Sequence, residues 1–141
     1  MFRIRRANEN DFRAICDFDE VARIHTARIE FIRKSLAEAV CLIAEAPEKI
    51  VGYGVLTNHF FGHGFVDLIY VDAGFRQRGI GGMLLVELEN SCQTEKIFTS
   101  TNLSNLPAQK LFNKIGYTLS GVVHNLDEND PEIIFYKLLS K

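Results

Sequence analysis

One stretch decides the fold: Arg76-Gln77-Arg78-Gly79-Ile80-Gly81-Gly82. It follows an apolar run at residues 65–71 and opens a helical pattern of apolar side chains. Its glycines leave backbone N–H groups unshielded, so a ligand oxygen can approach closely. The first turn of a helix has unpaired N–H donors and a partial positive charge, and no Ser, Thr, Asp or Asn stands here to cap them. The stretch therefore predicts a strand-to-helix turn that binds an anion, most often a phosphate. The alternative is a tight turn with two surface arginines.

The composition bounds the class of protein. At 141 residues, with 47% hydrophobic content and eleven Phe, the chain is expected to form a single domain, 1–141, with a real core. A net charge of −2 argues against nucleic acid as the partner. Three cysteines without a Cys-x-x-Cys pair indicate reduced thiols in the cytoplasm. No signal peptide is apparent, and the longest apolar stretch, residues 39–44, is too short for a membrane span.

The order of elements predicts an α/β chain with a mixed sheet and helices on both faces. Arg28, Arg33 and Lys34 are expected on the outer face of the second helix, and Glu87 and Glu89 on the solvated face of the third. Strands are expected at 2–6, 40–45, 50–61, 65–71, 97–101, 117–124 and 132–139, helices at 12–16, 26–39, 80–92 and 107–115, and turns at 47–49 and 62–64.

Two motifs in this order resemble the GNAT superfamily of acyl-CoA-dependent N-acetyltransferases. The first is Val71-Asp72-Ala73-Gly74-Phe75-Arg76-Gln77-Arg78-Gly79-Ile80-Gly81-Gly82-Met83-Leu84-Leu85, which is similar to the family's pyrophosphate-binding motif. The second is Asn105-Leu106-Pro107-Ala108-Gln109-Lys110-Leu111-Phe112-Asn113-Lys114-Ile115-Gly116-Tyr117. The resemblance covers nearly the whole chain. It implies a mostly antiparallel sheet of about seven strands in which strands four and five splay apart.

The resemblance also implies acetyl-CoA as the cosubstrate. The pantetheine would lie along Ile69, Tyr70 and Val71, with Asn105 and Phe112 close to it. Arg76 and Arg78 would add charge-assisted contacts to the diphosphate. The backbone groups that would hold the diphosphate belong to Gln77, Arg78, Gly79, Ile80, Gly81 and Gly82.

The catalytic groups are less regular. Acyl transfer to an amine needs a neutral amine, a stabilised oxyanion and a leaving thiolate. Resemblance points to a backbone N–H near Val71 for the oxyanion. Phe112 stands where many family members have a Tyr general acid, which leaves Tyr117, Tyr70 or water for that role. Asp67 is the first candidate for the general base because it interrupts an apolar strand; the alternatives are an ion pair with an arginine and a solvated position.

The predicted function is transfer of an acetyl group from acetyl-CoA to a primary amine by direct attack. The acidic loop at 125–132 would attract a cationic acceptor, unless it is only a solvated turn. His59 and His63 lack a third ligand, so no metal site is expected. The apolar run at 133–136 would support a homodimer. Alternatives are a non-catalytic acyl-CoA sensor, an acyltransferase for another acyl-CoA, and an unrelated phosphate-binding domain.

Overall fold

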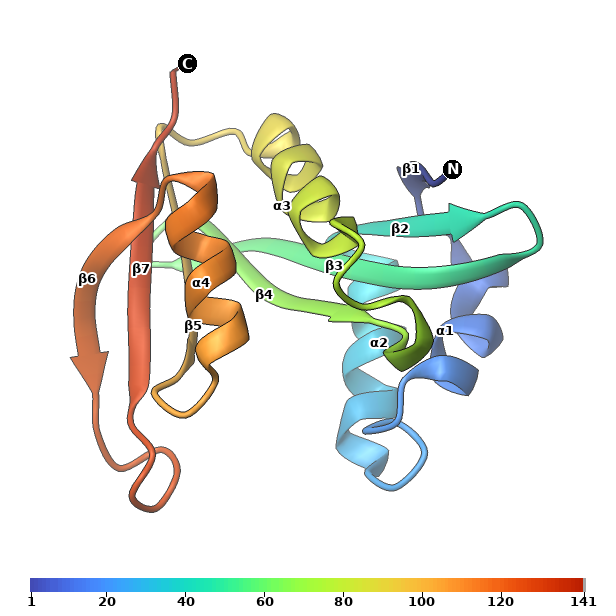
Figure 1. Cartoon of the computed structure of the whole chain (residues 1–141), viewed down its shortest axis with the longest axis horizontal. Helices are drawn as coiled ribbons and strands as arrows, with labels where there is room; N and C mark the ends of the chain where they lie inside the picture. The colour runs from blue at the N-terminus through green and yellow to red at the C-terminus, as the bar shows by residue number, and fades with distance from the viewer. Residues whose placement is uncertain (141) are drawn as a thin grey trace. The chain divides into compact units, whose positions relative to one another are not determined.

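The computed structural model describes residues 1–140. The elements, in chain order, are β1 (Arg3–Arg6), the 3-10 helix η1 (Glu9–Asp11), α1 (Phe12–Phe18), α2 (Thr26–Glu38), β2 (Val40–Ala46), β3 (Lys49–Phe60), β4 (His63–Val71), the 3-10 helix η2 (Ala73–Phe75), α3 (Ile80–Ser91), β5 (Lys96–Asn102), α4 (Leu106–Ile115), β6 (Thr118–Val123) and β7 (Glu132–Leu138) (Figure 1).

The strands form one seven-stranded mixed sheet in the order β1-β2-β3-β4-β5-β7-β6. The pairs β1·β2, β2·β3, β5·β7 and β6·β7 are antiparallel, whereas β4 and β5 are parallel. The mixed, mostly antiparallel sheet expected from the sequence is therefore confirmed. Within the described part of the chain, the parallel ladder joins Gly64 to Ile97, Phe65 to Phe98 and Val66 to Thr99 and stops there.

The chain divides into two compact units. Unit 1 comprises Met1–Leu56 and Leu68–Ser91; unit 2 comprises Thr57–Asp67 and the chain from Cys92 onward. The strands β3 and β4 contribute residues to both units. One domain over residues 1–141 stays a prediction.

Unit 1 has helices on both faces of β3. Tyr53 and Val55 are fully buried and share a core with Ile32 of α2. The intervening glycines face α3: a Cβ on Gly54 would lie 2.9 Å from a methyl carbon of Leu88. Alternation along the strand therefore directs large side chains to α1 and α2, and leaves room for α3 on the opposite face (Figure 1).

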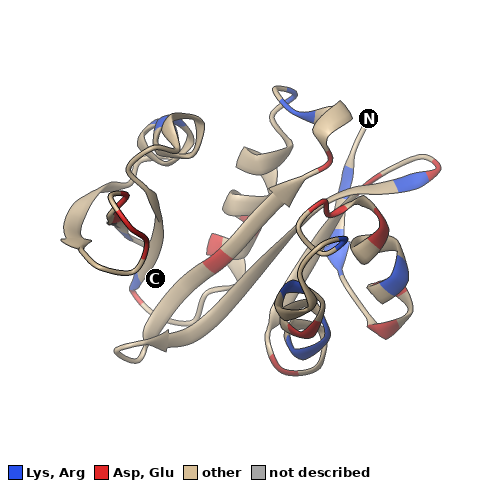
Figure 2. Cartoon of the chain, turned by 90° about the horizontal axis from the view of Figure 1, so that it is seen from below, with Lys and Arg blue, Asp and Glu red and all other residues tan. Residues whose placement is uncertain are grey.

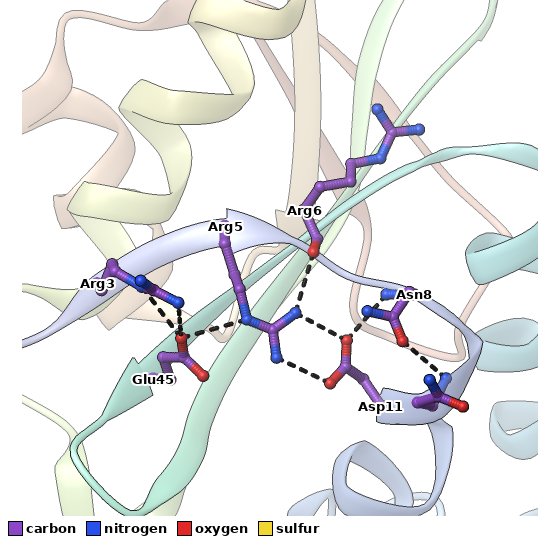
Figure 3. Close-up of polar contacts among 7 residues, drawn as sticks. Arg3, Arg5, Arg6, Asn8, Asp11 and Glu45 are labelled. Atoms are coloured by element: carbon purple, nitrogen blue, oxygen red, sulfur yellow. Dashed lines mark hydrogen bonds and ion pairs between the residues drawn. The ribbon is translucent and has the colours of Figure 1, made fainter.

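A network of charged side chains holds β1 in unit 1 (Figure 3). The Arg5 guanidinium donates two 3.0 Å hydrogen bonds to the Asp11 carboxylate and one of 3.2 Å to Glu45. Asp11 also accepts the backbone N–H of Asn8 at 2.8 Å, in a capping box that starts η1. The Arg5 hydrogen bond is the main cause that holds the pKa of Asp11 below its usual value.

In unit 2, α4 lies across β5 and β7 (Figure 1). Asn105 caps the helix by accepting the Ala108 N–H at 3.2 Å, and Gly116 ends it with φ at 107°. Phe112 is 5% exposed and its ring centre lies 5.4 Å from that of Phe135 in β7. The helix ends at Ile115, as predicted, and begins at Leu106, one residue before the predicted start at Pro107.

Three local expectations are wrong. The β3–β4 turn uses Phe61 and Gly62 rather than 62–64, because both adopt left-handed backbone angles and His63 already belongs to β4. Arg28 is half-buried rather than outside, because it pairs with a buried carboxylate. Glu89 is 8% exposed, since it falls one turn after Leu85 on the buried stripe of α3.

Candidate functional site

The start of α3 is a bare helix terminus in unit 1. Gly79 immediately precedes it with φ at 81°, a left-handed angle that glycine adopts without strain. The Met83 N–H bonds to the Gly79 carbonyl at 3.1 Å, so the N–H groups of Ile80, Gly81 and Gly82 precede the first bond of the helix. Gly79 has no side chain to cap them. Gln77, with φ at 63°, turns the chain just before this point.

Two buried contacts fix where this terminus lies. Ile80 is 1% exposed and anchors the first residue of α3 in the core of unit 1. A Cβ on Gly52 would lie 3.3 Å from Ile80 Cγ2 and 3.2 Å from the Tyr70 carbonyl oxygen. Gly52 therefore permits a close approach of α3 to β3 and β4. The Gly-x-Gly pattern inside an apolar strand was an available signal for this approach.

The two arginines of the loop are exposed, but each side chain contacts neighbouring residues. Arg76 Nε donates to the Val71 carbonyl at 2.9 Å, and its guanidinium carbon lies 5.4 Å from the centre of the Tyr70 ring. The Arg78 guanidinium lies 5.0 Å from the centre of the Phe75 ring. Each guanidinium is thus oriented by an aromatic ring while its remaining donors stay open to solvent. This arrangement suits an anion at the start of α3.

Asp72 steadies the turn between β4 and α3. Its carboxylate accepts the Gly74 N–H at 3.1 Å and Lys49 Nζ at 3.0 Å. Partial burial acts to raise the pKa of Asp72, but these two hydrogen bonds outweigh it, and the pKa lies below the ordinary value. The Asp72 carboxylate therefore stays charged, and Lys49 balances its negative charge.

A buried carboxylate that the sequence did not single out lies behind Tyr70 in unit 1. Asp19 is completely buried and accepts the Tyr53 hydroxyl at 2.6 Å and the Val21 N–H at 2.9 Å. Arg28 Nη1 lies 3.6 Å from the same carboxylate, and the Arg28 guanidinium lies 5.7 Å from the centre of the Tyr70 ring. Burial, followed by the hydrogen bond to Asp19, raises the pKa of Tyr53 above its usual range.

Tyr70 links the cluster of Asp19, Tyr53 and Arg28 to the loop at residues 76–79 before α3, which we call the anion loop. Its hydroxyl accepts the Glu20 N–H at 3.1 Å, and its ring contacts Arg28 and Arg76. Its neighbours in β4, Ile69 and Val71, are half-buried. The structure therefore brings the predicted residues Tyr70, Val71 and Arg76 together in unit 1.

Asp67 belongs to unit 2 and lies on the surface of β4. Its carboxylate accepts the Thr57 hydroxyl at 2.7 Å, and no ion pair to it is found among the described residues. Desolvation by neighbouring protein is the largest effect and raises the pKa of Asp67, although the Thr57 hydrogen bond and the charge of His59 oppose it. Asp67 is thus solvent-accessible and more basic than an ordinary aspartate.

The other predicted residues of unit 2 lie in and around α4. Asn105 caps the helix with its side-chain oxygen. Phe112 packs in the core with its ring centre 6.0 Å from that of Tyr117. Tyr117 is 2% exposed, and Lys137 Nζ lies 5.8 Å from the centre of its ring. The two aromatic side chains therefore meet in the core of this unit.

The acidic loop between β6 and β7 is held by hydrogen bonds to the end of β5 and to the segment between β5 and α4. Asp130 accepts the Ser104 N–H at 3.0 Å and the Ser104 hydroxyl at 2.6 Å, while Asp127 accepts Asn102 Nδ2 at 2.8 Å. The loop surrounds a pocket of about 440 Å³. The carboxylate-bearing residues of the loop are drawn in red in Figure 2. The lining residues are His124, Asn125, Asp127, Glu128, Asn129, Asp130 and Pro131.

No three His, Cys, Asp or Glu side chains of residues 1–140 lie together as a metal-binding group. None of the helices in the same part of the chain has both the length and the apolar character of a membrane span.

Comparison with known proteins identifies the family. A profile of the Acetyltransferase (GNAT) family matches residues 3–117. The crystal structure of a GNAT-family acetyltransferase from Bacillus cereus superposes with a TM-score of 0.93 at 37% identity, covering 100% of this chain and 99% of that one. Functionally curated proteins include no sequence match.

Two more distant structures share the fold. The ribosomal-protein-S18-alanine N-acetyltransferase from Escherichia coli has a TM-score of 0.83 at 17% identity, covering 100% of this chain and 96% of that one. A Salmonella typhimurium protein crystallised with its cofactor acetyl-CoA has a TM-score of 0.78 at 17% identity, covering 99% and 95% of the two chains. The family profile and the Bacillus cereus relative together show that this chain belongs to the GNAT family of acetyltransferases.

Proposed function

We propose that this protein is an N-acetyltransferase that transfers an acetyl group from acetyl-CoA to a primary amine by direct attack. The observation that carries the proposal is the start of α3, where left-handed Gln77 and Gly79 precede three N–H groups for which no side-chain acceptor is found among the described residues. Unpaired N–H groups at the start of a helix bind anions, and the anion expected for a GNAT protein is the diphosphate of acetyl-CoA.

The residues of the loop fit that ligand. The backbone N–H groups of residues 77–82 would hold the diphosphate, and Arg76 and Arg78 would each add donors. The half-buried strand residues Ile69, Tyr70 and Val71 would run beside the pantetheine. Asn105 and Phe112 stay proposed as neighbours of the cofactor, although their observed roles as cap and core residue already account for both. When bound, acetyl-CoA would supply the thioester carbonyl, and coenzyme A thiolate would be the leaving group that keeps the electron pair of the broken C–S bond.

Asp67 is the proposed general base. A lysine-like amine has a pKa near 10.4, so only about one molecule in a thousand is neutral at pH 7. The Asp67 carboxylate would accept the proton of the ammonium group, leaving a nitrogen lone pair that can form the C–N bond. Its accessibility and its raised pKa support this role. Tyr117 stays the proposed proton donor to the thiolate, although its burial favours a packing role.

The proposed acceptor is a small-molecule or peptide amine. The acidic loop of unit 2 supports a cationic acceptor, because four carboxylates in residues 127–132 attract positive charge. We also propose that residues 1–141 act as one acetyltransferase domain in the cytoplasm, and that a homodimer forms through the C-terminal strands.

Calorimetric titration with acetyl-CoA tests the proposal. The wild-type protein is expected to bind with micromolar affinity, and Gly81→Glu is expected to abolish binding because a carboxylate would occupy the anion site. Gly121→Glu is the matched control: a Cβ there meets nothing within 4 Å, so the same charge is added without filling the loop. Absence of binding by the wild-type protein would refute the cofactor assignment.

Turnover separates the enzyme from an acyl-CoA sensor. The enzyme releases thiol from acetyl-CoA when a suitable amine is present, and Asp67→Asn is expected to slow that release while leaving acetyl-CoA binding intact. Binding without thiol release across a broad amine screen would favour the sensor, a role that is compatible with Phe112 in place of a tyrosine.

A further inference from the structure

The sheet of unit 2 has one face covered by the helix α4 and an opposite face on which unit 2 places no helix among its described residues. The helix α4 is the one helix that unit 2 has among its described residues, and its Phe112 packs on Phe135 of β7. Side chains alternate along a strand, so Tyr136 points to the face opposite α4. The same alternation in β5 buries Thr99 and leaves Phe98 half-buried on that opposite face.

Four aromatic rings gather on the face opposite α4. Phe65 of β4, Phe98 of β5 and Tyr136 of β7 are direct cross-strand neighbours, so they form a row across three strands. The ring centre of Phe98 lies 5.8 Å from that of Tyr136. The ring of Phe60 in β3 stacks on that of Phe65 with the ring centres 5.0 Å apart, and the ring centres of Phe60 and Phe98 are 4.8 Å apart. All four residues are half-buried, and we call them the aromatic face.

Carboxylates lie beyond one end of the aromatic face. Asp67 follows Phe65 by two residues and therefore shares its face of β4. Glu132 shares the face of Tyr136 in β7 and accepts the Ser100 hydroxyl at 2.6 Å. Lys96 precedes Phe98 on its strand and so lies toward the opposite end, whereas the charge of His59 acts on Asp67 itself and lowers its pKa.

This distribution of rings and charges selects a cation with an apolar body. The faces of aromatic rings and a nearby carboxylate both attract an ammonium group, whereas neutral apolar molecules gain only from the rings.

We propose that the aromatic face binds the acceptor, and that the acceptor is an amine whose apolar, ring-bearing body rests on Phe98 and Phe65 with its ammonium group directed to Asp67. The proposal rests on the proposed function in taking Asp67 as the group that receives the proton. It narrows the acceptor from any primary amine to arylalkylamines and amines of similar shape.

Binding of simple probes tests the proposal without acetyl-CoA. Ligand-observed NMR titrations compare 2-phenylethylamine with n-butylamine, which lacks the ring, and with 2-phenylethanol, which lacks the charge, at pH 7. The wild-type protein is expected to bind 2-phenylethylamine about tenfold more tightly than either of the others, because only this probe engages ring and carboxylate together.

Variants identify the surface. Phe98→Leu keeps an apolar side chain of similar size but removes the ring, and is expected to weaken 2-phenylethylamine binding by about fivefold. Asp67→Asn should weaken 2-phenylethylamine and leave 2-phenylethanol unchanged. Leu119→Ala is the control, since Leu119 is 63% exposed on β6 and pairs with Phe135, on the opposite face of the sheet. Thermal unfolding verifies that each variant is folded, and Phe65→Leu replaces Phe98→Leu if the latter is not.

Three results would overturn the proposal: equal affinities of the wild-type protein for all three probes, an unchanged affinity in the folded Phe98 or Phe65 variant, or a wild-type dimer that Phe98→Leu dissociates without an effect on amine binding. The last result would assign the face to a second copy of the chain. A failure of acetyl-CoA binding, measured separately, would refute the proposed function and leave the amine titrations interpretable.

Discussion

At the scale of single residues, the carboxyl groups of this protein occupy very different environments. Asp72 accepts hydrogen bonds from a lysine and a backbone N–H, whereas Asp67 has one hydroxyl donor and a desolvating surround. The pKa of Asp72 is lowered and that of Asp67 is raised. Two aspartates five positions apart in the chain are thus suited to opposite tasks: one holds a turn, and one can take up a proton.

This difference predicts the titration of Asp67. By NMR titration of side-chain carboxyl carbons, its pKa is expected above the ordinary value of about 3.9, and that of Asp72 below it in the same spectra. Thr57→Val should raise the pKa of Asp67 further, because the Thr57 hydrogen bond stabilises the charged form. Activity should therefore fall as the pH drops through the pKa of Asp67, and in Thr57→Val it should fall at a higher pH. A pKa below 3.9 for Asp67 would contradict the argument.

Asp19 predicts a large effect on stability. Its replacement by alanine leaves the buried Tyr53 hydroxyl and the half-buried Arg28 without their acceptor, so the free energy of unfolding should decrease by about 3 kcal/mol. Asp17→Ala, an exposed position in the preceding helix, is the matched control and should change the free energy of unfolding little. Urea denaturation at pH 7 measures both, and equal stabilities for the two variants would exclude a structural role for Asp19.

At the scale of elements, the position of α3 depends on the absence of side chains in β3. Gly52 and Gly54 let the helix approach, and Ile80, Leu84 and Leu88 fill the space next to them. The strand β3 therefore determines where α3 starts, although β3 is distant in sequence from the loop that precedes α3.

Gly52→Val tests this dependence. The larger side chain would press on Ile80 and on the Tyr70 carbonyl, and the free energy of unfolding should decrease by about 2 kcal/mol. Acetyl-CoA binding should weaken as well, because the start of α3 is displaced. Gly121→Val in β6 is the control, since a Cβ there meets nothing within 4 Å and valine favours strands. A Gly52→Val protein as stable as the control would show that α3 does not rely on this contact.

Local chemistry explains which elements were predictable. The α4 helix has an Asn cap, an early Pro and a terminal Gly within twelve residues. The residues that form the anion loop are likewise consecutive in the sequence. Tyr53 lies 34 positions after Asp19 in the chain and meets it only after folding, so no spacing could reveal this buried pair. Arg28 and Glu89 were assigned to solvent by residue type, although their positions in the folded chain bury them. The aromatic face was missed for the same reason, since its rings come from four strands.

At the scale of the whole molecule, the shifted carboxyl groups determine how stability responds to acid. Asp11, Glu45 and Asp72 have lowered pKa values in the folded state, and the stability that they contribute is present above the ordinary carboxyl pKa. That contribution is lost as the pH falls through the lowered values. Asp67 acts in the opposite direction: its raised pKa contributes stability at low pH that is lost as the pH rises through that pKa.

Three groups against one predict a net loss of stability in acid. The urea midpoint should fall steeply below about pH 4, where these carboxyls begin to take up protons. Arg5→Gln should be less stable at pH 7 by about 2 kcal/mol, and should lose less further stability between pH 7 and pH 3, because Asp11 no longer has its main stabilising partner. Arg13→Gln, at an exposed position in α1, is the control. A pH dependence of Arg5→Gln identical to that of the wild type would contradict the assignment.

The strand order has a consequence for solubility. The sheet ends at β1 on one side and at β6 on the other, and the edge of any sheet is a template onto which a foreign strand can add. β1 carries Arg3, Arg5 and Arg6, which repel another copy of the same edge. β6 has no charged residue and exposes Leu119, Val122 and Val123. In concentrated solution the molecule is therefore guarded against self-association at its N-terminal edge and vulnerable to it at β6.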